Sequence, residues 1–393
     1  MHSFSSTIGI RPMHKLKFSI AMIVLHSFLG CSTDDTSNQE EPTCDSSSGD
    51  NCCDETMGQD CSTEATTPEQ NPEPLPGSCL RKPAGTTLVS SANEIKDNGD
   101  DFFDNAGPQC VSPENPYNGT GLRFGDFLVS NNAWNGQTSS ANWSQCIQLN
   151  PVGDSIMPSW DYDWGNEDDL VEGYEEWTVK TYPEVVYGTK SQNNIAGSCE
   201  DSGLPATYRQ LPNFTIDFDY TTTNGNSYVG DARFPDDNGD VQNIDVTNGD
   251  RNVAIESFFH SDCEIRRGGE DGNVEFELMV WLEKGNERRP SGDPSVGTFT
   301  DSENHVFDIY TKPSGNDAYI AYVAQDPIYT GRLHWNEFIE DVRLHSTNYG
   351  DENGNLIRGF DDEWCLGNIL FGTEIWWGDG SMELNDYQIT RDY

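Results

Sequence analysis

The chain has 393 residues and a strong acidic excess: 67 Asp and Glu stand against 22 Lys and Arg, a formal net charge of −45 at pH 7. A field of this sign repels the phosphate backbone, so nucleic acid is excluded as a partner. A neutral polymer such as a polysaccharide meets no such repulsion.

Residues 1–30 have the features of an export signal. Three basic residues precede an apolar stretch over 18–29, which is too short to span a bilayer because a spanning helix takes about 20 residues. The sequence FLGC then places Cys31 where a bacterial lipobox has its lipidated cysteine. We therefore predict an outer-membrane or cell-surface lipoprotein that meets the membrane only through its lipid. A plain secretory signal is the alternative.

Residues 31–78 are predicted to form a disordered acidic tether. The part after Cys31 holds 12 acidic residues and no Lys or Arg, and Ser, Thr, Pro and Gln make up most of the rest. Such a segment buries too little apolar surface to offset its ordering entropy. Its cysteines are spaced too irregularly for a zinc site, and export favours local disulfides among them: Cys44, Cys52, Cys53 and Cys61.

Residues 79–393 are long enough for one large domain, with 55 acidic against 19 basic residues. Short runs of alternating polarity recur along it, separated by Gly, Asn, Asp and Pro. Many short strands with such turns are typical of a sandwich or jelly roll. We predict an all-β jelly-roll sandwich of two antiparallel sheets, with strands within 124–134, 177–188, 213–223, 252–259, 273–282, 305–312, 318–325, 367–377 and 387–393.

Two segments of this domain differ from the rest. Residues 331–346 carry Leu333, Phe338, Ile339 and Val342 near a 3.6-residue period, which predicts one short helix. Residues 222–250 are rich in Asn, Asp and Gly, and we expect an inserted loop or hairpin there.

Three strands each place a glutamate beside aromatic or apolar side chains. Glu277 alternates with Met279 and Trp281, Glu374 shares a face with Trp376, and Glu256 alternates with Ala254 and Phe258. A lone glutamate on a strand is more often a surface residue. Two carboxylates flanking a sugar-sized groove, however, are what glycoside hydrolysis uses, one as nucleophile and one as acid and then base. Aromatic rings offer platforms for sugar rings.

The order and wording of these motifs resemble glycoside hydrolase family 12, whose members are mostly endo-β-1,4-glucanases and xyloglucanases. FELMVWL is similar to the family's YELMIWL, whose Glu is the nucleophile, and FGTEIWWG is similar to FGTEPFTG, whose Glu is the acid/base. The resemblance implies that Glu277 attacks and that Glu374, 97 residues later, is the acid/base. It also implies a retaining mechanism, with the two carboxyl groups about 5–5.5 Å apart. Glu256 stands where the family's VAYDL motif has Asp, which supports the nucleophile.

The same resemblance implies the substrate contacts and one disulfide. NNAW is similar to the family's NNLW segment and contributes Asn132 and Trp134. The other substrate contacts that we expect are Met279, Trp281, Pro290 and Trp376. A disulfide between Cys110 and Cys146 matches one of the family, while the pairing of Cys79, Cys199, Cys263 and Cys365 stays open.

No metal or organic cofactor is expected. The Asp-rich segments 97–101, 236–240 and 351–355 lack the distal bidentate Glu of a calcium loop, so acidic turns are the preferred interpretation.

The predicted function is therefore a monomeric, retaining, endo-acting β-1,4-glucan hydrolase with an open cleft. Cellulose, xyloglucan and mixed-linkage glucan all remain possible substrates. The alternative is a non-catalytic, glycan-binding jelly-roll lipoprotein. Such a protein would keep the aromatic residues without needing both Glu277 and Glu374.

Overall fold

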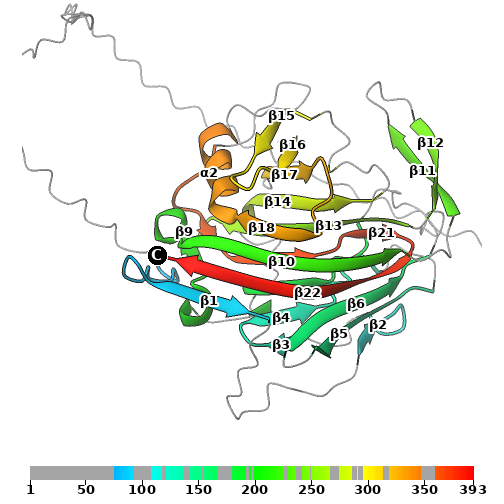
Figure 1. Ribbon diagram of the computed structural model, residues 1–393, viewed down its shortest axis with the longest axis horizontal. Helices are drawn as coiled ribbons and strands as arrows, with labels where there is room; N and C mark the ends of the chain where they lie inside the picture. The colour runs from blue at the N-terminus through cyan, green and yellow to red at the C-terminus, as the bar shows by residue number, and fades with distance from the viewer. Residues whose placement is uncertain are drawn as a thin grey trace, which may run out of the picture. The chain divides into compact units, whose positions relative to one another are not determined.

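Two β-sheets face each other in the computed structural model of the chain (Figure 1). The structure describes residues 75–92, 108–116, 121–136, 142–152, 155–165, 179–191, 194–195, 199–224, 229–235, 241–247, 249–265, 274–285, 290, 295–312, 318–346 and 359–393. The predicted signal, the tether with Cys31, and the three Asp-rich segments lie outside these residues. Within them, no helix is long and apolar enough to cross a membrane.

The smaller sheet has seven strands, and every pair in it is antiparallel. Its order is β18-β10-β22-β6-β5-β2, with β1 also paired to β22. Two long central strands, β10 and β22, pair along twelve residues of β10. The strands are β1 (Thr87–Ser91), β2 (Gln109–Val111), β5 (Ser144–Val152), β6 (Ser155–Asp163), β10 (Asn213–Asn224), β18 (Thr330–His334) and β22 (Asp379–Asp392).

The larger sheet has thirteen strands along the path β15-β16-β17-β14-β13-β20-β7-β4-β3. The others attach at its sides: β21 and β19 pair with β13, β9 with β19 and β8 with β7. The strands are β3 (Leu122–Phe124), β4 (Phe127–Ser130), β7 (Glu184–Ser191), β8 (Asn194–Ile195), β9 (Ala206–Thr207), β13 (Asp250–His260), β14 (Val274–Lys284), β15 (Gly297–Thr300), β16 (Val306–Lys312), β17 (Ala318–Ala324), β19 (Cys365–Leu366), β20 (Asn368–Gly372) and β21 (Ile375–Trp377).

The all-β jelly-roll prediction is confirmed, with one exception to antiparallel pairing. Strand β17 runs parallel to β14, with Glu277 beside Tyr319 in the register. The exception arises because β15, β16 and β17 form a meander whose last strand returns to the edge of β14 in the same direction. The parallel pairing places Tyr319 of β17 beside Glu277. An antiparallel pairing of the same two strands would have placed a different residue there.

The main hydrophobic core lies between the two sheets. Strand β14 contributes Phe276, Leu278, Val280 and Leu282, all fully buried, as its alternation predicts. From the smaller sheet, the buried side chains in this core include Phe214, Ile216, Phe218, Tyr387 and Ile389. Because successive strand residues point to opposite faces, the other set on β14, which includes Glu277, lies on the outer face of the larger sheet.

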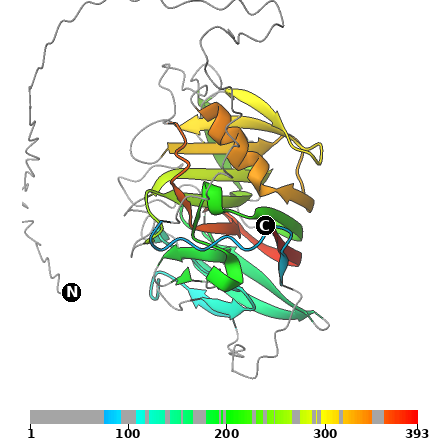
Figure 2. The same cartoon turned by 90° about the vertical axis from the view of Figure 1, so that its left-hand side faces the viewer.

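The predicted helix begins later than expected. The segment from Thr330 to His334 is strand β18, paired with β10, and helix α2 covers Trp335–His345. Leu333 is buried as a residue of β18, and an apolar residue at this position also fits the helical period, so the pattern alone could not distinguish a strand residue from a helical one. Helix α2 lies beside β15–β17 (Figure 2), where Phe338 packs 5.1–5.3 Å from the rings of Phe299, Phe307 and Tyr322.

The inserted segment forms a hairpin, one of the two expected forms. Strands β11 (Val229–Pro235) and β12 (Val241–Thr247) pair only with each other and belong to neither large sheet (Figure 1). Two short helical turns precede β10, namely α1 (Cys199–Ser202) and the 3-10 turn η3 (Tyr208–Gln210).

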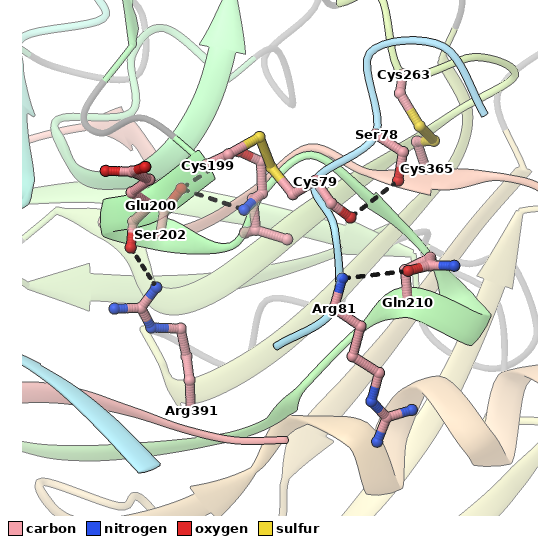
Figure 3. The surroundings of a disulfide bond; sticks show 11 residues. Ser78, Cys79, Arg81, Cys199, Glu200, Ser202, Gln210, Cys263, Cys365 and Arg391 are labelled. Carbon is pink, nitrogen blue, oxygen red and sulfur yellow. Dashed lines mark hydrogen bonds between the residues drawn. A yellow bond between two sulfur atoms is a disulfide. The ribbon is translucent and has the colours of Figure 1, made fainter. Parts of the chain in front are cut away.

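Three disulfides are present among the described residues. Cys110 is bonded to Cys146 across β2 and β5, the pairing that the family resemblance implied. Cys79 is bonded to Cys199, and Cys263 to Cys365. Figure 3 shows the last two near the start of the described chain, where the backbone N–H of Cys79 also donates to the Pro205 carbonyl at 2.7 Å. The N-terminal end of the domain is thus covalently attached to α1.

Candidate active site

Strand β14 places Glu277 on the outer face of the larger sheet. Its side chain is half-buried, with Phe258 of β13 directly across from it and Tyr319 of β17 on the other side. Met279 and Trp281 follow on the same face but are buried, with relative exposures of 1% each. The carboxylate therefore stands at the border between exposed and buried surface.

Glu374 lies in a two-residue break between β20 and β21, where the pairing with β13 is interrupted. Its side chain is half-buried. The break is held from β13 by Asn252, whose backbone N–H donates to the Glu374 carbonyl at 3.0 Å. The Asn252 side chain also accepts from the Glu374 N–H at 3.0 Å and donates to its carboxylate Oε2.

Glu256 is buried on β13, between Leu370 of β20 and Met279 of β14. Burial raises the pKa of its carboxyl group well above the ordinary value. The nearby Lys190 ammonium opposes this shift, and the charges of Glu277, Glu184 and Glu374 add to it. The structure thus brings all three predicted carboxylates into one electrostatic cluster.

Two tyrosines also belong to this cluster, and sequence reasoning missed both. Burial raises the pKa of Tyr319, with further contributions from Glu374, Glu277 and Glu256. The pKa of Tyr182 is raised by burial and then by Glu256, Glu184 and Glu374. The Tyr182 hydroxyl donates to the Ala254 carbonyl at 3.0 Å. Alternation could have assigned Tyr319 to a face of β17, but only the strand order shows that this face borders Glu277, and Tyr182 precedes β7 outside any strand.

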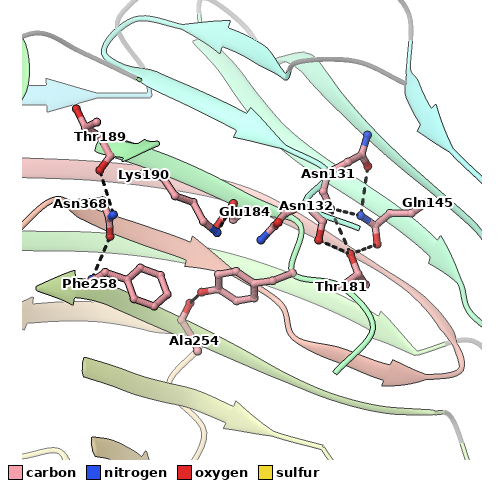
Figure 4. A network of polar contacts seen from close by, with 11 residues as sticks. Asn131, Asn132, Gln145, Thr181, Glu184, Thr189, Lys190, Ala254, Phe258 and Asn368 are labelled. Atoms are coloured by element: carbon pink, nitrogen blue, oxygen red, sulfur yellow. Dashed lines mark hydrogen bonds and ion pairs between the residues drawn. The ribbon is translucent and has the colours of Figure 1, made fainter. Parts of the chain in front are cut away.

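A buried ion pair lies beside the three carboxylates. The Lys190 ammonium is 3.0 Å from each carboxylate oxygen of Glu184, and the two side chains are 6% and 0% exposed (Figure 4). The ammonium also lies 5.9 Å from the ring centroids of Tyr182 and Phe258. Its positive charge offsets part of the repulsion that four neighbouring carboxylates create.

Gly372 makes room for this arrangement. It pairs with Glu184 on one side and Ala254 on the other, so it lies between the ion pair and β13. A Cβ atom at Gly372 would lie 2.8 Å from Tyr182 Cζ and 3.0 Å from Glu184 Cβ. The absent side chain lets both residues approach the cluster.

The predicted substrate contacts differ in exposure. Trp134 is 47% exposed and Asn132 is half-buried, whereas Trp376 is buried like Met279 and Trp281. Asn132 has a φ of 40°, and its carbonyl accepts from the Tyr182 N–H at 3.2 Å, which ties the segment to the residues just before β7. Pro290 is half-buried.

The buried substrate-contact candidates, Met279, Trp281 and Trp376, belong to a second apolar cluster on the outer face of the larger sheet, separate from the main core. The rings of Trp281 and Trp376 are 6.0 Å apart, and the cluster also contains Ala254, Met279, Tyr310, Ala321, Val323 and Trp377. In this structure these side chains pack against one another beside Glu277 instead of presenting exposed platforms. Among the described residues no group of His, Cys, Asp and Glu side chains has the geometry of a metal site.

The comparisons with known proteins agree with this architecture. Endoglucanase S of Pectobacterium parmentieri is 24% identical to the chain over 271 residues, which cover 68% of this chain and 83% of that protein. The native family 12 xyloglucanase of Bacillus licheniformis matches the structure with a TM-score of 0.51 at 18% identity, covering 71% of this chain and 98% of that one. A family 12 xyloglucanase from the same species, in complex with ligand, matches with a TM-score of 0.50 at 16% identity, covering 78% and 100%.

No family model matches the chain. The solved structures nevertheless confirm the expected fold, and together with the endoglucanase they confirm the expected resemblance to glycoside hydrolase family 12.

Replacing Glu256 by Gln should change how stability depends on pH. Because the folded-state pKa of Glu256 is raised, the folded protein keeps a proton that the unfolded chain releases above a pH of about 4.3. The free energy of unfolding therefore declines as pH rises from the pKa of the unfolded chain toward the raised pKa of the folded protein. Urea unfolding of wild type and Glu256→Gln from about pH 4.5 to about pH 7.5 should show the variant gaining relative stability with pH. Parallel curves would contradict this expectation.

The buried Lys190–Glu184 pair should be costly to break from one side. Lys190→Met leaves a buried carboxylate without its ammonium, so we expect a loss of about 3–5 kcal/mol in the free energy of unfolding. The double variant Lys190→Met/Glu184→Gln should recover much of this loss. As a control, Arg343→Met breaks the 2.7 Å pair with Glu340 on α2, whose side chains are 29% and 39% exposed, and should cost about 1 kcal/mol or less. A double variant no more stable than Lys190→Met would refute the expected charge compensation.

Proposed function

We propose that this protein is a retaining, endo-acting β-1,4-glucan hydrolase, with Glu277 as nucleophile, Glu374 as acid/base and Glu256 as supporting carboxylate. The observation that carries the proposal is the convergence of these carboxylates on one sheet face, from β14, the β20–β21 break and β13. Glycoside hydrolysis needs two carboxyl groups in different protonation states. Several carboxylates that share a partly buried site cannot all ionise at neutral pH, so such a state arises from their mutual repulsion.

The reaction divides into two displacements at the anomeric carbon. In the first, the Glu277 carboxylate attacks that carbon while Glu374 gives its proton to the departing glycosidic oxygen, so a glycosyl ester forms and a shortened chain leaves. In the second, Glu374 takes a proton from water, the water oxygen attacks the same carbon, and the Glu277 ester breaks. Two inversions give net retention. A neutral Glu256 next to Glu277 would donate to the nucleophile and keep it ionised.

The names of the similar proteins favour a plant-type β-glucan as substrate. One is called an endoglucanase and two are called xyloglucanases. Trp134, exposed on the segment after β4, is the best candidate for a sugar platform, with Asn132 as a polar contact. The buried aromatic cluster around Trp281 and Trp376, with Met279, would support the site from beneath, and Pro290 would border it. A non-catalytic glycan receptor would have no use for a cluster of buried carboxylates.

Release of reducing ends is the test of this function. Soluble cellulose derivatives, xyloglucan and mixed-linkage β-glucan should be assayed with the wild type and with Glu277→Gln. We expect activity on at least one polymer and a fall of several orders of magnitude in the variant, with substrate binding largely kept, because the attacking charge is removed. Residual activity within about tenfold of wild type would argue against Glu277 as nucleophile.

The acid/base role of Glu374 has its own signature. Glu374→Ala removes the proton donor of the first step and the base of the second, so polysaccharide hydrolysis should collapse. On an activated aryl glycoside the first step needs little protonation, and azide should accelerate the second step and yield a β-glycosyl azide. An α-azide, or no acceleration, would show that Glu374 is not the acid/base of a retaining mechanism.

We also propose that Cys31 carries the lipid of a surface lipoprotein and that residues 31–78 tether the catalytic domain, 79–393, to the membrane. The support is the sequence of the signal and of the acidic segment that follows it.

Changing Cys31 to Ser should therefore release the enzyme from the membrane fraction of its host into the soluble periplasmic or extracellular fraction. The lipid is the expected anchor, and fractionation followed by the reducing-end assay measures the release. A variant that still partitions with the membrane would contradict the lipid anchor.

A further inference from the structure

We infer that Asn252 is a positioning residue for the acid/base, and that it fixes the Glu374 carboxyl group so that Oε1, and not Oε2, carries the proton that is transferred. This inference rests on the proposed function. It concerns a residue of β13 that takes no part in the motifs by which the site was identified.

Asn252 binds Glu374 at three points. Its backbone N–H donates to the Glu374 carbonyl at 3.0 Å, and its side-chain Oδ1 accepts from the Glu374 N–H at 3.0 Å. Its side-chain Nδ2 donates to Glu374 Oε2. Asn252 itself is fully buried. A single rigid amide thus fixes both the backbone and the carboxyl group of the residue that has to deliver a proton.

The sheet explains why an amide is needed here. Gly372 at the end of β20 pairs with Ala254, and Ile375 at the start of β21 pairs with Arg251. Between them the ladder is broken, so the Glu374 N–H has no strand carbonyl opposite it and takes the Asn252 Oδ1 instead. The neighbouring backbone N–H groups are satisfied from the other side: Thr373 donates to Pro183 and Ile375 to Thr181, each at 3.1 Å.

This backbone bond also fixes which end of the amide faces the carboxyl group. A flipped amide would place its NH2 against the Glu374 N–H, which would oppose two donors in a buried site. The Nδ2 group is therefore held on the side of Oε2. Because NH2 can only donate, Oε2 must act as the acceptor in either protonation state of Glu374.

The position of the proton follows from this constraint. In a neutral carboxyl group the carbonyl oxygen is the better acceptor, so Oε2 is the carbonyl oxygen and Oε1 carries the hydrogen. As the proton leaves toward the glycosidic oxygen, negative charge develops on the carboxylate and the bond from Nδ2 becomes charge-assisted and stronger. Asn252 therefore stabilises the transition state of proton donation more than the ground state, which is the condition for raising the rate.

The test is the dependence of rate on the leaving group. The wild type and Asn252→Ala should be compared on a polysaccharide and on aryl β-cellobiosides whose phenols span a range of acidity. We expect kcat on the polysaccharide and on poorly activated glycosides to fall at least tenfold, because these need the proton. On the most activated glycoside the loss should stay below about threefold, with KM changed less than about twofold throughout.

Asn368→Ala is the matched control. Asn368 is also fully buried in this sheet and also bridges two segments: its Nδ2 donates to the Thr189 carbonyl at 3.1 Å and its Oδ1 accepts from the Phe258 N–H at 3.2 Å (Figure 4). It contacts no carboxylate in these bonds. The control should lose stability on thermal unfolding, and any loss of activity should be the same factor on every substrate.

An equal loss by Asn252→Ala on all leaving groups, or a loss below threefold on the polysaccharide, would overturn the inference. If Asn252→Ala does not fold, Asn252→Asp keeps the acceptor for the Glu374 N–H and removes the amide donor, and the same leaving-group dependence is expected of it. An inactive wild type on all β-glucans and aryl glycosides would refute the proposed function itself. If the wild type is active and the Asn252 variant loses activity by the same factor on every leaving group, as the Asn368 control does, only the role of Asn252 is refuted.

Discussion

The repulsion between carboxylates that share one poorly solvated face governs the rest of this structure. The charges of Glu184, Glu277 and Glu374 all add to the raised pKa of Glu256, and the Lys190 ammonium, which opposes this shift, lies 3.0 Å from Glu184. Charges in such a place interact far more strongly than in water. Because burial and these neighbouring charges raise the pKa of Glu256, this carboxyl group keeps its proton more readily than a solvent-exposed one, which reduces the repulsion in the cluster.

The width of the larger sheet is what makes this assembly possible. The carboxylates come from four neighbouring segments in the order β7, the β20–β21 break, β13 and β14, and each strand also contributes apolar residues to the core between the sheets. The alternation of each strand separates an outer face that carries the carboxylates from an inner face that packs in the core. The two-residue break at Glu374 is a local departure from regular pairing, and Gly372, which is regularly paired, leaves space beside the side chains of Tyr182 and Glu184.

Much of the fold and part of the site could be predicted from the sequence, because both depend on alternation. The faces of β14 and the pairing of Glu277 with Met279 and Trp281 follow from a period of two. The start of α2 was predicted too early because Leu333 satisfies a strand and a helix equally well. The burial of Trp281 and Trp376 was not predicted either. Alternation assigns a side chain to a face of the sheet, but it does not show whether other side chains pack over that face.

The remaining members of the site could not be found from alternation. Glu184 and Lys190 are 72 and 66 residues from Glu256 along the chain, and they approach it only because β20 pairs with β7 on one side and with β13 on the other. The role of Asn252 depends on a break in a ladder whose partner strand lies 122 residues away. Strand order and register are features of the tertiary structure, and a single sequence contains little information from which to predict them.

The disulfide between Cys79 and Cys199 also has a mechanical consequence. Strand β1 pairs with β22 at the side of the smaller sheet and would be unzipped one residue at a time by a force applied to the chain before it. The covalent bond precedes β1, so tension arriving from the N-terminal direction passes into α1 at Cys199 instead of reaching the β1 hydrogen bonds. An enzyme working on an insoluble or entangled polymer experiences drag, and this attachment lets the sandwich resist drag without loss of a strand.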